Sequence, residues 1–188
     1  TASGLCAGIY DATITDANGC TEVITVGVSD NTNEILDVAA TQVSCFGDCN
    51  GTVSVNVTCA DPTCTLVWND PAASTTNTVT GLCAGTYAVT VTNGLGCITI
   101  ATVDVIEPPL LTLSMSNTDV LCFGTCTGTG TALPAGGTAP YSFAWNAAGQ
   151  TTSTSFNLCP GTFSVVVTDA SGCTVNGSVI IDEPSPLS

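Results

Sequence analysis

The chain has 188 residues and carries 15 Asp and Glu but no Lys, Arg or His, so its formal net charge is −15. Without cationic side chains it has no basic surface for phosphates or anionic lipids, which excludes nucleic-acid binding and attraction to a membrane surface. The same composition excludes His-based catalytic triads and Lys nucleophiles.

Three blocks of the chain align with one another, and a second pair of blocks lies between them. The cysteines that open the three blocks are 77 and 76 residues apart, at Cys6, Cys83 and Cys159. The blocks are GLCAGIYDATITDANGC (4–20), GLCAGTYAVTVTNGLGC (81–97) and NLCPGTFSVVVTDASGC (157–173), with VSCFGDCNGTVSV (43–55) and VLCFGTCTGTGTA (120–132) as the second pair. This periodicity predicts the C-terminal half of a repeat at 1–30 and full repeats at 31–108 and 109–188.

Each full repeat shows short runs of alternating Thr and Val, separated by turn residues, and no helical period. We expect six strands per repeat, at 34–43, 51–58, 64–69, 75–81, 86–92 and 97–106, and at 110–121, 126–133, 140–146, 151–157, 162–168 and 173–182. Short strands with turns every 8–12 residues indicate an all-β fold of tandem immunoglobulin-like β-sandwiches. The chain contains no apolar run of about 18 residues, so no membrane-spanning helix is predicted.

Aromatic residues occupy the positions that such sandwiches use for their core and corners. Trp68 and Trp145 lie on the third strand of each repeat, among residues that alternate inward. Tyr10 and Tyr87 open the fifth strand, where a tyrosine corner forms in this fold. The last repeat has Phe163 there and lacks the hydroxyl. We therefore expect both Trp residues in the core rather than on a sugar-stacking surface.

Twelve cysteines without His and without paired Cys-x-x-Cys spacing favour disulfides formed in an extracellular compartment. Shared ends of the sandwich predict the pairs Cys49–Cys83 and Cys126–Cys159. Cys59 and Cys64 flank one short loop and are expected to bridge each other. For the other four, two arrangements remain. Either Cys45–Cys97 and Cys122–Cys173 close within each repeat, or Cys45 meets Cys173 across consecutive repeats. The first is preferred because every repeat then folds independently, and Cys6 and Cys20 are expected to lack partners.

The order of motifs in the last repeat resembles the SprB repeat. The motifs are CFGxC, APYSFAWNAAGQTTSTSFNLCPGTF, VVVTDASGC and IIDEP. SprB repeats occur in tandem in very large surface adhesins of gliding Bacteroidota. The resemblance implies a secreted, cell-surface polypeptide exported by type IX secretion, whose repeats form a stalk that moves during gliding motility. Residues 58–65 of the middle repeat depart from the pattern of 136–141.

The sequence therefore predicts a non-enzymatic stalk or spacer of a cell-surface adhesin, held by disulfides against force and proteases. Its partners would be neighbouring repeats, with surface glycans or other chains of the same protein as further candidates. The alternatives are a lectin-like module that binds glycans or Ca²⁺, and a subunit of a self-assembling extracellular filament. No cofactor or metal site is predicted. If Ca²⁺ binds, the candidate ligands are Glu107, Asp182 and Glu183 at repeat ends.

Overall fold

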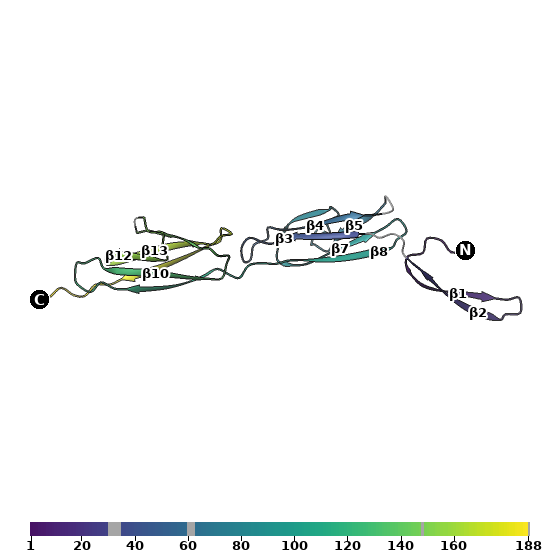
Figure 1. Ribbon diagram of the computed structural model, residues 1–188, viewed down its shortest axis with the longest axis horizontal. Coiled ribbons are helices and arrows are strands. Elements are labelled where there is room, and N and C mark those ends of the chain that lie inside the picture. Colours follow the sequence, from purple (N-terminus) through teal and green to yellow (C-terminus); the bar gives the residue numbers. More distant parts are fainter. Residues whose placement is uncertain (30–34, 60–62, 148, 188) are drawn as a thin grey trace. The chain divides into compact units, whose positions relative to one another are not determined.

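The computed structural model describes residues 1–29, 35–59, 63–147 and 149–187. The regular elements of this part of the chain are β-strands (Figure 1). They are β1 (Gly8–Thr15), β2 (Thr21–Val28), β3 (Ile35–Thr41), β4 (Gly51–Thr58), β5 (Thr65–Trp68), β6 (Thr78–Leu82), β7 (Gly85–Thr92), β8 (Ile98–Val105), β9 (Thr112–Thr118), β10 (Gly128–Ala135), β11 (Ser142–Trp145), β12 (Thr154–Leu158), β13 (Gly161–Thr168) and β14 (Thr174–Ile181). No helix in the described ranges is long and apolar enough to cross a membrane.

The chain forms two compact units. The first comprises the described residues within Thr1–Thr41 and Thr52–Val105, and the second those within Gln42–Gly51 and Ile106–Ser188. The loop between β3 and β4 is therefore part of the second unit.

Both units contain two three-stranded antiparallel sheets with the same connectivity. In the first unit the strand orders are β3-β4-β6 and β5-β7-β8, and in the second they are β9-β10-β12 and β11-β13-β14. With the strands of a repeat lettered A, B, C, E, F and G, these are an ABE sheet and a CFG sheet, the division found in immunoglobulin-like sandwiches. The all-β, immunoglobulin-like fold class is confirmed.

The hairpin β1–β2 has the register of the F–G hairpins of the full repeats. Gly8 is opposite Val28, as Gly85 is opposite Val105 and Gly161 is opposite Ile181. Identical register follows from identical turn length, since a hairpin's turn fixes which residues pair. The expected boundary between residues 30 and 31 lies outside the described residues.

Strands β6 and β12 begin about three residues later than the sequence predicts, for a shared reason. The indole N–H of Trp68 donates to the carbonyl of Thr76 at 3.1 Å, and that of Trp145 donates to the carbonyl of Thr152 at 2.9 Å. Each Thr hydroxyl then donates to a carbonyl two residues on. These bonds hold the chain before each strand in a loop, and the strands start at Thr78 and Thr154.

A small aliphatic core around one tryptophan fills each sandwich. Trp68 is 1 % exposed and Trp145 is 7 % exposed. In the second unit the buried neighbours of Trp145 are Val120, Ala132, Leu158, Val165, Val167, Val179 and Ile181. Alternation places these residues on the inner faces, because side chains two apart on a strand share a face.

Candidate functional site

The sites of interest in this chain are its disulfides. The structure joins Cys126 to Cys159 and Cys59 to Cys64, the pairs that the sequence suggests. Cys49 and Cys83 are each disulfide-bonded. Cys20 and Cys122 are free and exposed.

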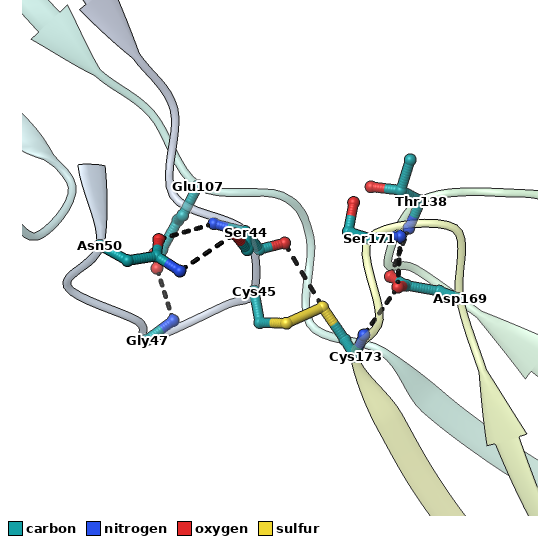
Figure 2. The surroundings of a disulfide bond; sticks show 9 residues. All are labelled: Ser44, Cys45, Gly47, Asn50, Glu107, Thr138, Asp169, Ser171 and Cys173. Atoms are coloured by element: carbon teal, nitrogen blue, oxygen red, sulfur yellow. Dashed lines mark hydrogen bonds between the residues drawn. A yellow bond between two sulfur atoms is a disulfide. The ribbon is translucent and has the colours of Figure 1, made fainter. Parts of the chain in front are cut away.

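The preferred pairing of the remaining cysteines within each repeat is wrong. The structure joins Cys45 to Cys173 across a sequence separation of 128, with the two Cα atoms 5.7 Å apart (Figure 2). This is the alternative that the sequence left open, a bond between consecutive repeats. Cys122 consequently has no bond to Cys173.

Strand length explains why Cys45 and Cys97 do not pair. The amide of Val43 donates to the carbonyl of Ile106 at 3.2 Å, so Cys45 lies near the residue that follows β8. Cys97 precedes β8 at its opposite end. Eight extended residues span about 26 Å, whereas a disulfide needs Cα atoms within roughly 7 Å.

The expectation that Cys6 lacks a partner is also wrong. Cys6 is bonded to Cys97, with a sequence separation of 91. The bond ties the segment before β1 to the turn between β7 and β8. Sequence comparison missed it because Cys6 aligns with Cys83 and Cys159, for which the sequence predicts a different class of partner, Cys49 and Cys126 at the start of the second strand.

The loop that presents Cys45 is held by side chains on both sides (Figure 2). Gly47 N–H donates to Oε2 of Glu107 at 2.8 Å. Asn50 Oδ1 accepts from Ser44 N–H at 2.9 Å, and Asn50 Nδ2 donates to Ser44 Oγ at 3.0 Å. These bonds fix the loop at both flanks of Cys45, so that its sulfur meets Cys173 with little loss of conformational freedom.

Cys173 is presented by the turn between β13 and β14, which is organised by one carboxylate. Oδ1 of Asp169 accepts from Ser171 N–H and Cys173 N–H, each at 2.9 Å, and Oδ2 accepts from Thr138 N–H at 2.8 Å. The bond from Thr138 is the largest cause that lowers the pKa of Asp169, and burial opposes it. The carboxylate therefore binds the turn to the loop between β10 and β11 most strongly when it is ionised.

Apolar residues surround the disulfide. A groove of about 160 Å³ is lined by Cys45, Phe46, Pro109, Leu110, Leu111, Gly137, Cys173 and Thr174. Ser44 carbonyl oxygen lies 3.3 Å from Cys173 Sγ. Since a disulfide sulfur has no proton, this is a packing contact rather than an S–H hydrogen bond. The Cys45–Cys173 disulfide and the residues that line this groove form a joint, in which a covalent bond is combined with side-chain packing.

The same loop architecture recurs at Cys122, without the disulfide. Gly124 N–H donates to Oε2 of Glu183 at 3.0 Å, as Gly47 does to Glu107. Thr125 N–H donates to the carbonyl of Cys122 at 3.2 Å, as Asp48 N–H does to that of Cys45 at 3.0 Å. Two of the three candidate Ca²⁺ ligands, Glu107 and Glu183, thus accept backbone hydrogen bonds in equivalent loops.

The third candidate Ca²⁺ ligand, Asp182, makes its hydrogen bonds through its backbone N–H and carbonyl. Its N–H donates to Oδ1 of Asp119 at 3.0 Å and its carbonyl accepts from Val120 N–H at 3.1 Å. Among the described residues, no group of three or more His, Cys, Asp or Glu side chains is placed to hold a metal ion. The acidic side chains near the Cys45–Cys173 disulfide, Glu107 and Asp169, accept hydrogen bonds from backbone N–H groups.

The aromatic candidates lie in the interior or at the corners. Both Trp rings are buried and donate to backbone carbonyls, so neither presents a stacking face. Tyr10 Oη donates to the carbonyl of Cys6 at 2.9 Å, and Tyr87 Oη donates to that of Cys83 at 3.0 Å. Each hydroxyl therefore holds the segment just before its strand, and the residue that accepts the hydrogen bond is itself in a disulfide.

Sequence reasoning missed the structural roles of Glu107, Asn50 and Asp169. A signal was present, since Glu107 and Glu183 are separated by 76 residues, close to the 77 between Gly47 and Gly124. Co-repetition of an acid and a glycine next to a repeated cysteine indicates a contact between them. The acid follows the last strand of its repeat and the glycine lies in the loop after the first strand, so their contact depends on these two segments lying side by side.

The match to a sequence family falls on this region. Residues 116–150 match the SprB repeat. The matched segment runs from within β9 to the loop after β11 and includes the loop that presents Cys122. No curated protein matches the chain in sequence.

Solved structures offer distant likenesses. A C-terminal 282-residue fragment of intimin, solved with the intimin-binding domain of the translocated intimin receptor, is 15 % identical with a TM-score of 0.43, covering 81 % of this chain and 64 % of that chain. A structure that addresses Dscam isoform specificity is 11 % identical with a TM-score of 0.35, covering 94 % and 54 %. The amphioxus IgVJ-C2 molecule is 14 % identical with a TM-score of 0.33, covering 82 % and 99 %. These scores are low, and the fold assignment depends on the sheet topology itself.

Proposed function

We propose that this chain is a non-enzymatic stalk segment of an extracellular cell-surface adhesin, in which disulfides limit extension under force. The observation that carries the proposal is the Cys45–Cys173 bond, which connects the loop between β3 and β4 to the turn between β13 and β14. Tension applied along the chain passes through this bond. Residues 46–172 lie inside the covalent loop and are shielded from extension.

The match of residues 116–150 to the SprB repeat supports the cell-surface part of the proposal. We further propose that the parent polypeptide is exported by type IX secretion and serves gliding motility, as the resemblance to SprB repeats implies. Disulfides in this number are typical of oxidising, extracellular compartments. The absence of Lys and Arg leaves proteases specific for basic residues without a cleavage site.

The proposed organisation is one half-repeat at 1–30 and two full repeats at 31–108 and 109–188. It is supported by the shared register of the β1–β2, β7–β8 and β13–β14 hairpins. The proposed partners are neighbouring repeats, because the Cys45–Cys173 bond joins residues that belong to successive repeats of the sequence. The long, acidic, disulfide-linked chain would serve as a spacer that gives reach.

Single-molecule force spectroscopy on the chain, attached through added terminal handles, tests the proposal. Under non-reducing conditions we expect no extension from the segment between Cys45 and Cys173. With reductant, the separation of 128 residues releases about 430 Å of further contour, at about 3.4 Å per residue. The Cys45→Ser, Cys173→Ser double variant is the control, and it should release part of this length without reductant. Equal extension of the native chain in both conditions contradicts a force-limiting role.

A further inference from the structure

The two free cysteines are the repeat equivalents of the two halves of the Cys45–Cys173 bond. Cys122 lies 77 residues after Cys45, and Cys20 lies at the position of Cys173 in the aligned blocks. Both thiols are exposed in the part of the chain that the structure describes. One chain thus presents an unbonded copy of each side of a joint that it also contains in bonded form.

The Cys20 side is already shaped like the Cys173 side. Oδ1 of Asp16 accepts from Asn18 N–H and Cys20 N–H, each at 2.9 Å. In the bonded joint, Oδ1 of Asp169 makes the same two bonds at the same distances. In both turns the acid's N–H also donates to the cysteine carbonyl at 2.9 Å. Cys20 therefore needs no rearrangement of its turn to act as Cys173 does.

The Cys122 side is shaped like the Cys45 side and carries an uncovered apolar groove. Its Cys-Phe-Gly loop is held by Glu183, as the Cys45 loop is held by Glu107. The groove measures about 490 Å³ and is lined by Leu121, Cys122, Phe123, Pro184, Ser185, Pro186 and Leu187. Leu121 is 86 % exposed and Phe123 is 55 % exposed. The equivalent Phe46 lines the groove that Cys173 and Thr174 enter, which shows what kind of segment belongs here.

We propose that this groove receives the β1–β2 turn of a second copy of the chain, and that Cys122 of one copy forms a disulfide with Cys20 of the other. The contact is heterologous, because each copy uses a different surface, so repetition gives an open, head-to-tail array. The inference deepens the proposed stalk function and rests on its extracellular setting. It extends the covalent joint seen within one chain to a joint between chains.

The oxidation requires an electron acceptor, for which we name a low-molecular-weight disulfide such as oxidised glutathione. One thiolate attacks the glutathione disulfide, forms a mixed disulfide and releases one glutathione thiol. The second cysteine thiolate then displaces the remaining glutathione. In total two protein thiols are oxidised, one glutathione disulfide is reduced to two thiols, and the two thiol protons are transferred to these.

Complementary single variants provide the test. Cys20→Ser retains Cys122 as its free thiol, and Cys122→Ser retains Cys20, so neither variant should form a covalent dimer by itself in oxidised glutathione. An equimolar mixture should form a dimer that stops at two chains, and the native chain should form a ladder on non-reducing electrophoresis. Digestion at acidic residues followed by mass spectrometry should find the Cys20–Cys122 linkage. Dimers of either variant by itself, or no dimer in the mixture, would overturn the proposal.

A pair of phenylalanines separates a specific joint from random thiol oxidation. Phe123 and Phe156 are 55 % and 53 % exposed, but only Phe123 lies in the groove. Phe123→Ser should slow ladder formation about tenfold, from the loss of an apolar contact, whereas Phe156→Ser should leave the rate unchanged. Equal rates would indicate collision of accessible thiols and contradict a docked interface.

The same digest distinguishes failure of this inference from failure of the proposed function. If the Cys45–Cys173 linkage is present and the native chain stays monomeric, the interchain joint is wrong and the stalk proposal stands. If Cys45 and Cys173 remain reduced under the same oxidant, the proposed function fails.

Discussion

At the scale of single residues, Ser155 stands out as a polar side chain buried without a partner. It is 0 % exposed, and its hydroxyl makes no hydrogen bond among the described residues. The equivalent position in the first unit, 76 residues earlier, is the buried Val79. A buried hydroxyl without a hydrogen bond destabilises the folded state, because it loses its hydrogen bonds to water and gains none within the protein.

We therefore expect Ser155→Ala to raise the free energy of unfolding of the second unit by about 1 kcal/mol. Urea unfolding followed by the fluorescence of Trp145, in a Trp68→Phe background, measures it. Val79→Ala in the first unit, followed by the fluorescence of Trp68 in a Trp145→Phe background, is the control and should be destabilising, because it removes apolar contacts only. A loss of stability in Ser155→Ala would show that the hydroxyl has a partner.

The ionisation of Asp169 affects the turn that presents Cys173. The bond from Thr138 N–H, with others from its own turn, lowers the pKa of Asp169 below its ordinary value, which is about 3.9. A lowered pKa in the folded state means that the stabilisation is fully present above the ordinary value. It is lost as the pH falls through the folded-state pKa.

We expect the second unit to lose stability on acidification below about pH 4, with unfolding curves at several pH values as the measurement. Asp169→Asn should be less stable at pH 7, because an amide N–H₂ replaces the acceptor that Thr138 uses. It should also flatten the acid dependence. Asn93 holds the equivalent position in the first unit and keeps the bonds from Leu95 and Cys97, so the turn itself should survive. An unchanged pH profile in the variant would contradict this role.

At the scale of elements, the two sandwiches reach the same sheet topology with different inner faces. Position 130 on β10 is Gly, whereas the equivalent position 53 on β4 is a fully buried Val. A Cβ on Gly130 would lie 2.9 Å from Val179 Cγ2 and 3.2 Å from Trp145 Cη2. The small residue therefore provides the space that the Trp145 ring occupies.

Gly130→Val should lower the free energy of unfolding of the second unit by about 1–3 kcal/mol, the usual cost of overpacking a core. Thermal unfolding by calorimetry would measure it. Gly27→Val is the matched control, because a Cβ there meets nothing within 4 Å, and its effect should stay within about 0.5 kcal/mol. Equal effects of the two substitutions would show that the space beside Trp145 adjusts freely.

At the scale of the whole molecule, the disulfides differ in how much chain each one closes. The sequence separations are 128 for Cys45–Cys173, 33 for Cys126–Cys159 and 5 for Cys59–Cys64. A cross-link restricts the unfolded chain more when it closes a longer loop. With small aliphatic cores, these restrictions are a large share of the stability.

Replacing both cysteines of a pair by Ser should therefore destabilise in this order of loop length. We expect losses of about 5, 4 and 2 kcal/mol for the three pairs, from the loop-closure relation. Chemical denaturation of the three double variants beside the native chain gives the comparison. The reverse order would contradict the view that loop closure dominates.

The sequence by itself determined the fold class, the repeat and the approximate strand positions, because alternation of Thr and Val and the turn residues are local properties of the chain. It also placed Trp68 and Trp145 inward, since strand geometry makes side-chain direction periodic. The starts of β6 and β12 were predicted less well, because in each unit they depend on a tertiary contact, the hydrogen bond from the Trp indole to a Thr carbonyl.

Only the tertiary structure decided the partners of Cys6, Cys45, Cys97 and Cys173. The repeat spacing assigns Cys45 and Cys97 to the same repeat and makes their pairing attractive, but β8 holds them at opposite ends of an eight-residue strand. Cys173 reaches Cys45 because loop 42–51 is part of the second unit. A disulfide depends on a distance of a few ångströms in space, and such distances are set by which strand ends adjoin rather than by residue order.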